Sequence, residues 1–349
     1  MRLSFSCLLA LLAFGLACSV LAQTTSTPRV PQPNPDATAA LDRCLKKVGE
    51  LPSYGLNFRQ LAATPGLPTT NEGRLVFTPQ RRIRYQLDSK HADTQARLTI
   101  ICDGKTLWHL VDAGPTKEYT TYRLDDLEEE LKRLATGQSD LDLSKVEELR
   151  KQLDLEHGFR GILPVLEDLK AKLTFTGIEP GTLMPDGGPP RPVVILDGEW
   201  NKEVRALIVP PKADPQKGPD GKENPSAAPP VDPMVAFDKR QNQPYVPRRA
   251  KLFIDKESSL PMRLEWWGPK KPGGPDELLS QFDWIWHPPM PAEQLATQFA
   301  LTPEESKLSI KSLSSKEWLR YRVESMVRQQ QREKEMLRGR GLDVAPVKP

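Results

Sequence analysis

The chain has 349 residues, a formal net charge of +3 and a mean hydropathy of −0.51. Basic and acidic side chains nearly balance, and no segment matches a nucleic-acid-binding module, so nucleic acid is not expected as a partner. Prolines are abundant, at 35, whereas aromatic residues make up only 7% of the chain. Because the prolines are clustered, they indicate linkers joined to a folded core.

The first 22 residues predict a secretory signal peptide. A positive residue near the start precedes an apolar run over residues 8–16, and Val20-Leu21-Ala22 ends in the small residue that a signal peptidase reads. The apolar run is shorter than the roughly 20 residues of a bilayer span. We therefore expect cleavage before Gln23 and a periplasmic or otherwise exported protein. The alternatives are an uncleaved N-terminal anchor and lipid attachment at Cys18, which follows Gly15-Leu16-Ala17.

The next residues predict a leader, a helix and then a series of strands. Residues 23–35 form a Pro- and Thr-rich segment without any pattern, which indicates disorder. Asp36 is the expected N-cap of a helix with one apolar face. Alternation of apolar and polar residues predicts strands, and Asp103-Gly104 offers the turn of a tight hairpin because Gly accepts a positive φ. The expected strands are 74–77, 82–87, 95–102, 106–111, 118–122, 173–178, 192–200, 204–209, 250–255, 262–267 and 279–286.

Helices are expected in the middle third of the chain and at its end. The middle helices have apolar faces that include Leu127 and Leu131 in one, and Leu166 and Leu169 in another. Residues 210–233 are too rich in Pro, Gly and charge to bury a core, which predicts a disordered insert. The order helix, strands, helices, strands, helix predicts an α+β fold with one antiparallel sheet. We expect one domain over residues 36–305, followed by a charged helix and tail over 306–349.

Two cysteines, Cys44 and Cys102, follow the predicted signal peptide. An even number of cysteines in an exported protein permits a disulfide between them. The alternative is two small buried side chains, because free cysteine is often simply part of a core.

The sequence lacks the familiar motifs of catalysis and metal binding. Its histidines are scattered without a second ligand at metal spacing, and it has no nucleophile elbow, phosphate-binding loop or dinucleotide fingerprint. His109 lies in an expected strand beside Trp108, where a structural role is more common than that of a base. We therefore expect a protein that is not an enzyme and that has no metal ion or other cofactor.

A set of short motifs lies in and around the expected strands. The motifs are Phe58-Arg59-Gln60, Gly73-Arg74-Leu75, Pro79 with Arg84-Tyr85, Asp103-Gly104-Lys105 with Trp108, and Phe282-Asp283-Trp284 with Pro288-Pro289. In combination they resemble those of the LolA family of bacterial outer-membrane lipoprotein carriers and its relatives, including the lipid-binding domain of RseB-type sensors. The resemblance covers about residues 38–303 without the insert.

The resemblance implies a curved antiparallel sheet, an incomplete β-barrel, whose concave side is covered by helices and holds an apolar cavity for acyl chains of lipids or lipoproteins. One face of each strand would line that cavity. The expected lining residues are Phe77, Ile83, Tyr85, Leu98, Ile100, Trp108, Leu264, Trp266, Phe282 and Trp284, and the expected lid-helix residues are Leu127, Leu131, Leu166 and Leu169. The alternative is that these side chains pack directly on the helices and leave no void.

The chain also departs from the family pattern. Carriers have an arginine before the proline of the first hairpin, where it helps to hold the lid closed, whereas this chain has Thr78 there and Arg81, Arg82 and Arg84 nearby. The charged segment 316–340 is an addition, and its apolar stripe predicts either a helix docked by its first turns or one that meets a membrane or envelope protein.

Two functions follow from these patterns and stay open at this point. The first is an exported protein that binds lipid or lipoprotein acyl chains, with a role in lipoprotein transport. The second is a non-catalytic interaction or sensor module of the cell envelope that uses the same fold to bind a protein.

Overall fold

The computed structural model describes residues 31–64, 67–91, 94–135, 150–151, 154, 158–185, 188–201, 204, 244–314 and 316–319. Several expectations lie outside these residues and stay predictions. They are the signal peptide, lipid attachment at Cys18, most of the leader, residues 205–209 of an expected strand, the insert 210–233 and the charged segment beyond residue 319.

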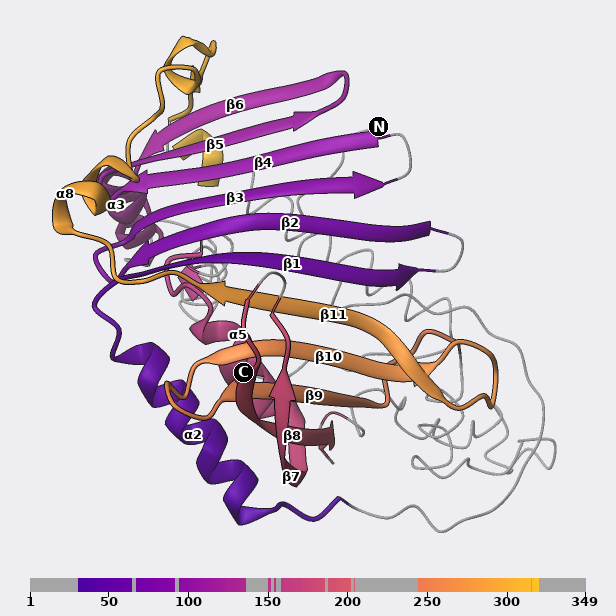
Figure 1. Ribbon diagram of the computed structural model, residues 1–349. Helices are drawn as coiled ribbons and strands as arrows, with labels where there is room; N and C mark the ends of the chain where they lie inside the picture. Colours follow the sequence, from indigo (N-terminus) through magenta and orange to yellow (C-terminus); the bar gives the residue numbers. More distant parts are fainter. Residues whose placement is uncertain are drawn as a thin grey trace, which may run out of the picture.

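One sheet of twelve strands organises the described part of the chain (Figure 1). The strands are β1 (Tyr54–Thr64), β2 (Leu67–Thr78), β3 (Arg82–His91), β4 (Thr94–Asp103), β5 (Thr106–Ala113), β6 (Thr116–Arg123), β7 (Leu173–Leu183), β8 (Arg191–Trp200), β9 (Arg249–Asp255), β10 (Pro261–Pro269), β11 (Asp276–Trp286) and β12 (Lys311–Ser312). Their order is β12-β6-β5-β4-β3-β2-β1-β11-β10-β9-β8-β7. All neighbours pair antiparallel except β12 and β6, which run parallel. The sheet is open, because β12 and β7 form its two ends.

Three helices cover one face of this sheet, which we call the inner face. They are α2 (Pro35–Gly49), α3 (Leu124–Ala135) and α5 (Leu163–Lys172), and α3 and α5 lie behind the sheet in Figure 1. Leu41 of α2, Leu127 of α3 and Leu166 of α5 share one core with Leu56 and Ile83 of the sheet. The expected α+β architecture, a mostly antiparallel sheet covered by helices on one side, is thereby confirmed.

The first helix begins slightly earlier than the sequence pattern predicts. Its N-cap is Asn34, not Asp36, and Pro35 takes the first helical position. The Asn34 side-chain oxygen accepts hydrogen bonds from the backbone N–H groups of Asp36, at 2.9 Å, and Ala37, at 3.3 Å. Both residue types can cap, but proline at the first turn has no N–H to satisfy and its fixed φ suits a helix start.

The turn between β4 and β5 is the hairpin expected at Asp103-Gly104. Gly104 has a φ of +96°, a backbone conformation that side-chain-bearing residues rarely adopt. The Asp103 carboxylate accepts hydrogen bonds from the N–H groups of Lys105, at 2.8 Å, and Thr106, at 2.7 Å. The side chain of Asp103 and the missing Cβ of Gly104 thus fix the turn together.

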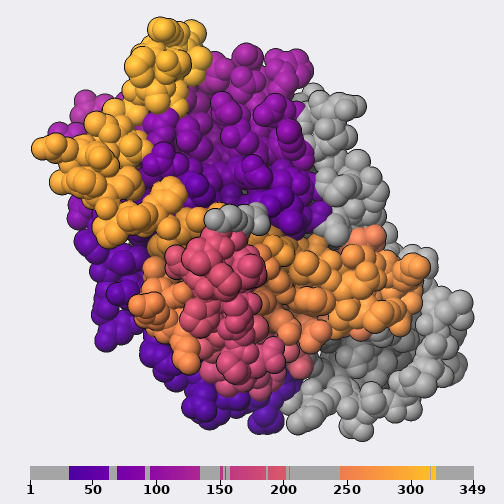
Figure 2. All heavy atoms as spheres, viewed as in Figure 1, coloured from indigo at the N-terminus to yellow at the C-terminus, as the bar shows by residue number. Residues whose placement is uncertain are grey.

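The C-terminal segment wraps around one side of the sheet and binds both of its faces. It includes the short helix α8 (Ala292–Thr297), the 3₁₀ helix η1 (Glu305–Lys307) and β12. In Figure 2 this segment, in yellow, lies against the indigo and purple atoms of the N-terminal strands. Leu319 reaches the core of the inner face, and Trp318 packs against Tyr122 of β6 with ring centroids 4.8 Å apart. β12 and Leu319 therefore belong to the sheet and to its core.

A buried ion pair fixes this segment on the opposite face, the outer face of the sheet. Arg84 of β3 lies 2.5 Å from a carboxylate oxygen of Glu305 and donates to the carbonyl oxygen of Ala300 at 2.9 Å. The two charged side chains are only 7% and 15% exposed. Burial alone raises the pKa of Glu305, but hydrogen bonds from Arg84 and Thr302 outweigh it and hold the pKa below its ordinary value.

Candidate functional site

The inner face brings together all but one of the expected lining residues. They come from β2, β3, β4, β10 and β11, and several are direct cross-strand partners. The residues that belong to this core or pack against it are Phe77, Ile83, Tyr85, Leu98, Ile100, Leu264, Trp266, Phe282 and Trp284. Their common face follows from strand geometry, because residues two apart point to the same side of a sheet.

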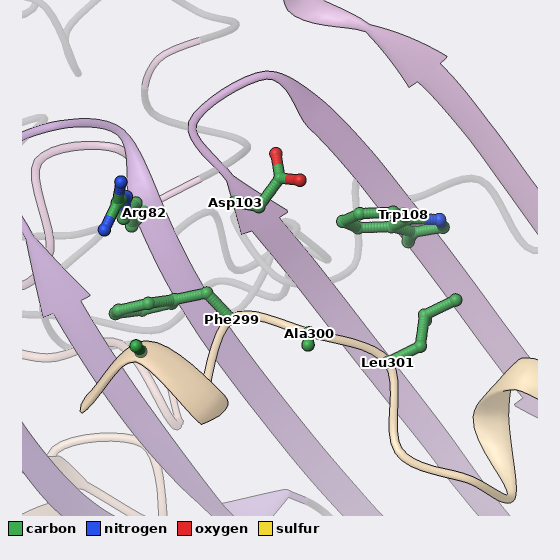
Figure 3. A pocket seen from close by; sticks show the side chains of 7 residues that line it. Arg82, Asp103, Trp108, Phe299, Ala300 and Leu301 are labelled. Atoms are coloured by element: carbon green, nitrogen blue, oxygen red, sulfur yellow. The ribbon is translucent and has the colours of Figure 1, made fainter. Parts of the chain in front are cut away.

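Trp108 is the exception and corrects the expected lining. Trp108 pairs with Ile101, while its neighbour Leu107 pairs with Cys102 in the buried core. Because successive residues of a strand face opposite sides, Leu107 takes the inner position and Trp108 lies on the outer face. An apolar residue is accommodated there because the C-terminal segment covers that part of the outer face, as Phe299 and Leu301 beside Trp108 show (Figure 3).

A row of aromatic rings crosses the inner face over four strands. Phe58 of β1 stacks on Tyr85 of β3, with centroids 5.4 Å apart and planes 12° from parallel. On its other side Phe58 stacks on Phe282 of β11, at 5.5 Å and 13°, and Phe282 contacts Trp284 at 5.0 Å. Stacked pairs of this kind contribute about 0.5–1.5 kcal/mol each beyond the area that they bury. Phe58 was absent from the expected lining, although its motif was singled out in the sequence.

Gly73 makes the stack possible. Gly73 lies on β2, between Phe58 of β1 and the next strand, β3, and is the cross-strand partner of Phe58. A Cβ at this position would collide with the ring of Phe58 and with the carbonyl oxygen of Gln86. The ring of Phe58 therefore reaches across β2 and meets Tyr85 on the strand beyond.

The helices above this face supply the four expected lid residues. Leu127 and Leu131 of α3, and Leu166 and Leu169 of α5, are all buried in the same core as the strands. The turn before α5 is tied to the sheet by Tyr54, whose hydroxyl oxygen accepts a hydrogen bond from the Ile162 N–H at 2.9 Å.

An arginine in the turn between β2 and β3 binds α3. Arg81 adopts a φ of +57° and places its guanidinium 2.8 Å from a carboxylate oxygen of Glu128 on α3. The same guanidinium lies 5.9 Å from the ring centroid of Phe159, and Arg150 binds the other oxygen of Glu128 at 3.0 Å.

The inner face is packed with buried side chains, and two hollows on the described surface lie away from it. One, of about 570 Å³, lies between α2 and α5 beside Leu45 and Leu163. The other, of about 430 Å³, lies on the outer face between Arg82, Trp108 and Phe299 (Figure 3). Tyr85, Trp266 and Phe282 of the inner face nevertheless keep part of their surface accessible. Tyr85 is also deeply enough surrounded for burial to raise the pKa of its hydroxyl.

Both cysteines are free in the structure, so the possible Cys44–Cys102 disulfide is not formed. Cys44 faces the core from α2, and Cys102 is the last residue but one of β4, where its sulfur accepts a hydrogen bond from the Gly104 N–H at 3.4 Å. Burial raises the pKa of each thiol to about 12. They are therefore packed side chains, the second of the two sequence interpretations.

Two histidines, His109 and His287, lie at separate places in the sheet. His109 lies on β5 opposite Ile100, whereas His287 follows β11 and donates its backbone N–H to Gly55 at 2.9 Å. Burial and the nearby charge of Arg74 lower the pKa of His287. Within the described ranges, no three His, Cys, Asp or Glu side chains gather as a metal site. Among the helices described, none is both long and apolar enough to span a membrane.

Comparison with known proteins finds likenesses only among solved structures. No family model and no curated protein matches the chain. MucB in complex with MucA(peri) matches at 13% identity and a TM-score of 0.28, over 74% of this chain and 59% of MucB. LprF from Mycobacterium bovis matches at 13% identity and a TM-score of 0.35, over 74% of this chain and 96% of LprF. A LolA superfamily protein from Nitrosomonas europaea matches at 10% identity and a TM-score of 0.20, over 74% of this chain and 96% of that protein. The chain is similar to these solved structures, one of which is described as a LolA superfamily protein.

Proposed function

We propose that this protein binds an apolar chain, the acyl chain of a lipid or lipoprotein, on the inner face of its sheet beneath α3 and α5. The observation that carries the proposal is the aromatic row Tyr85–Phe58–Phe282–Trp284, which crosses four strands and keeps accessible surface at Tyr85 and Phe282. A continuous aromatic row of this kind offers contact along the length of a chain without any charged group.

The inner face is filled in this structure, so the chain takes the place of the lid side chains. Each methylene that leaves water contributes about 0.8 kcal/mol, so a chain of ten methylenes contributes roughly 8 kcal/mol. The Arg81–Glu128 contact that opposes lid movement is part exposed, at 39% and 27% of the two side chains. Solvent-exposed ion pairs are worth only about 0–1 kcal/mol. This ion pair therefore adds little to the burial of the lid leucines, whose apolar contacts an acyl chain would have to replace.

A titration with a fluorescent fatty acid tests this proposal with a matched pair of variants. Tyr85→Ser removes a ring from the inner face, and we expect it to weaken binding about tenfold through lost apolar contact. Trp108→Ser removes a larger ring from the outer face of a neighbouring strand pair and should leave the affinity unchanged. Equal affinities of the wild-type protein and the Tyr85 variant would show that the fatty acid does not bind on the inner face.

The same proposal places the protein in the cell envelope, where the predicted signal peptide would deliver it and where acyl chains are present. The sequence features that support this place are the positive n-region, the apolar run and the small residues before Gln23. Cleavage there would release a protein free to shuttle between membranes, whereas lipid attachment at Cys18 would tether it.

A second candidate function is that of a protein-binding module, and the hollow on the outer face favours it. That hollow combines an exposed Arg82 with the ring of Trp108, both suited to a peptide side chain. If this is the binding site, Trp108→Ser should abolish partner binding, and the protein should take up no fatty acid.

A further inference from the structure

A pair of amide side chains adjoins the aromatic row on the inner face. Gln60 lies two residues after Phe58 on β1, between its cross-strand partners Asn71 of β2 and Phe282 of β11. The Asn71 side-chain nitrogen donates a hydrogen bond to the Gln60 side-chain oxygen at 3.0 Å. The two amides therefore form one polar group at the edge of the aromatic row.

One atom of this pair is unsatisfied. Asn71 is only 4% exposed, yet its side-chain oxygen accepts no hydrogen bond from any described residue. A buried acceptor without a donor costs about 1–3 kcal/mol. Beyond Gly73, the inner-face positions of β2 hold the apolar residues Leu75 and Phe77. An apolar residue would avoid that cost at position 71. A ligand that brings its own donor would avoid it as well.

We infer that Asn71 accepts a hydrogen bond from the head of the bound chain, and that the site selects acyl chains joined through an amide over those joined through an ester. This inference rests on the proposed function. A chain lying along Tyr85, Phe58 and Phe282 ends beside Gln60 and Asn71. An amide linkage presents an N–H at that point, which satisfies the Asn71 oxygen. An ester presents an oxygen in the same place and leaves the acceptor unpaired.

Two ligands that differ in a single group test the inference. N-palmitoylglycine has an amide N–H where O-palmitoylglycolate has an ester oxygen, and both have the same chain and the same carboxylate. Each is titrated into the full-length protein by displacement of the fluorescent fatty acid. We expect the amide to bind the wild-type protein about tenfold more tightly, which is the effect of satisfying one buried acceptor.

The variants assign that preference to one side chain. Asn71→Leu should bind both ligands with equal affinity. Only its affinity for the amide ligand should differ from that of the wild-type protein. Asn57→Ala serves as the control, because Asn57 is an exposed residue of the same strand as Gln60 and faces the outer side; its preference should match that of the wild-type protein. Thermal unfolding of each variant checks the fold independently of binding.

The outcomes separate this inference from the proposed function. Equal affinity of the wild-type protein for both ligands overturns the inference and leaves acyl-chain binding in place. A preference that survives in Asn71→Leu also overturns it, since another group must then bind the N–H. Binding of neither ligand overturns both.

Discussion

The ring of Phe58 lies over Gly73, its cross-strand partner, and thereby meets Tyr85 one strand further on. The two residues belong to motifs that are separate in the sequence, Phe58-Arg59-Gln60 and Gly73-Arg74-Leu75. In the sheet they are a single packing unit, because the missing side chain of one makes room for the ring of the other. Without that space the aromatic row would be interrupted at β2.

Gly73→Ala should lower the free energy of unfolding by about 1–3 kcal/mol, because the added methyl group overpacks the Phe58 ring and the Gln86 carbonyl. Urea denaturation measures the loss. Gly49→Ala is the matched control, since Gly49 ends α2 with open space around it and alanine favours a helix by up to about 1 kcal/mol. A Gly73 variant as stable as its control would contradict the packing described here.

Arg81→Gly should raise the affinity for a fluorescent fatty acid about fivefold without a large loss of stability. Glycine removes the contact with Glu128, which makes lid opening easier by about 1 kcal/mol, and it also relieves the positive φ of Arg81. Apparent affinity rises with the population of the open lid. Arg82→Ala, at the neighbouring exposed residue, should leave the affinity unchanged. A weaker affinity in the Arg81 variant would show that the contact does not restrain the lid.

Glu305→Gln should destabilise the protein by about 3 kcal/mol at pH 7, because it leaves the buried Arg84 without its counter-charge. The pKa of Glu305 is lower in the folded state than in the unfolded one, so this contribution is complete above the unfolded value of about 4.3. It is lost as the pH falls through the folded value. Urea denaturation at pH 7 and pH 3 should therefore show the difference between wild type and variant shrinking in acid. A constant difference would contradict the ion pair.

Tyr54→Phe should cost about 1–3 kcal/mol of stability, because the buried N–H of Ile162 loses its acceptor at the start of α5. Tyr85→Phe is its control: the described residues provide no hydrogen-bond partner for that hydroxyl, so the change should be close to neutral. Both are measured by thermal and urea denaturation. Equal effects of the two changes would mean that the Tyr54 hydroxyl does not hold the lid turn.

Cys44 and Cys102 should resist thiol reagents in the folded protein and react fully in urea. Their pKa values of about 12 leave almost no thiolate at neutral pH, and both side chains are buried. The mature protein should also keep the same intact mass after reduction. A gain of about two daltons, the mass of two hydrogens, would reveal a disulfide and contradict the structure.

Strand alternation in the sequence predicts most of this sheet, and β1 shows why it falls short of the whole. Ile83, Tyr85 and Leu87 alternate with polar residues, so β3 is evident without any structure. On β1 the residues that face the inner side are Leu56, Phe58 and Gln60. Gln60 is polar and therefore breaks the apolar pattern of this face. Only the motif at residues 58–60 pointed to this strand.

The site departs from the sequence prediction where distant segments meet. Arg84 alternates with apolar residues and resembles a solvated outer residue, but Glu305, 221 positions later, buries it. The same C-terminal cover explains why Trp108 is apolar although it faces outward. Neither local period nor composition specifies which distant segment will cover a face, because that choice depends on long-range packing.

Native mass spectrometry of the purified mature protein, combined with lipid extraction, tests the central claim most directly. Binding of an acyl chain beneath α3 and α5 predicts co-purifying acylated species, and it predicts uptake of added phospholipid or lipopeptide by any apo fraction. Tyr85→Ser should hold less of either, whereas Trp108→Ser should match the wild-type protein. A clean apo mass that takes up neither lipid would contradict acyl-chain binding by this fold.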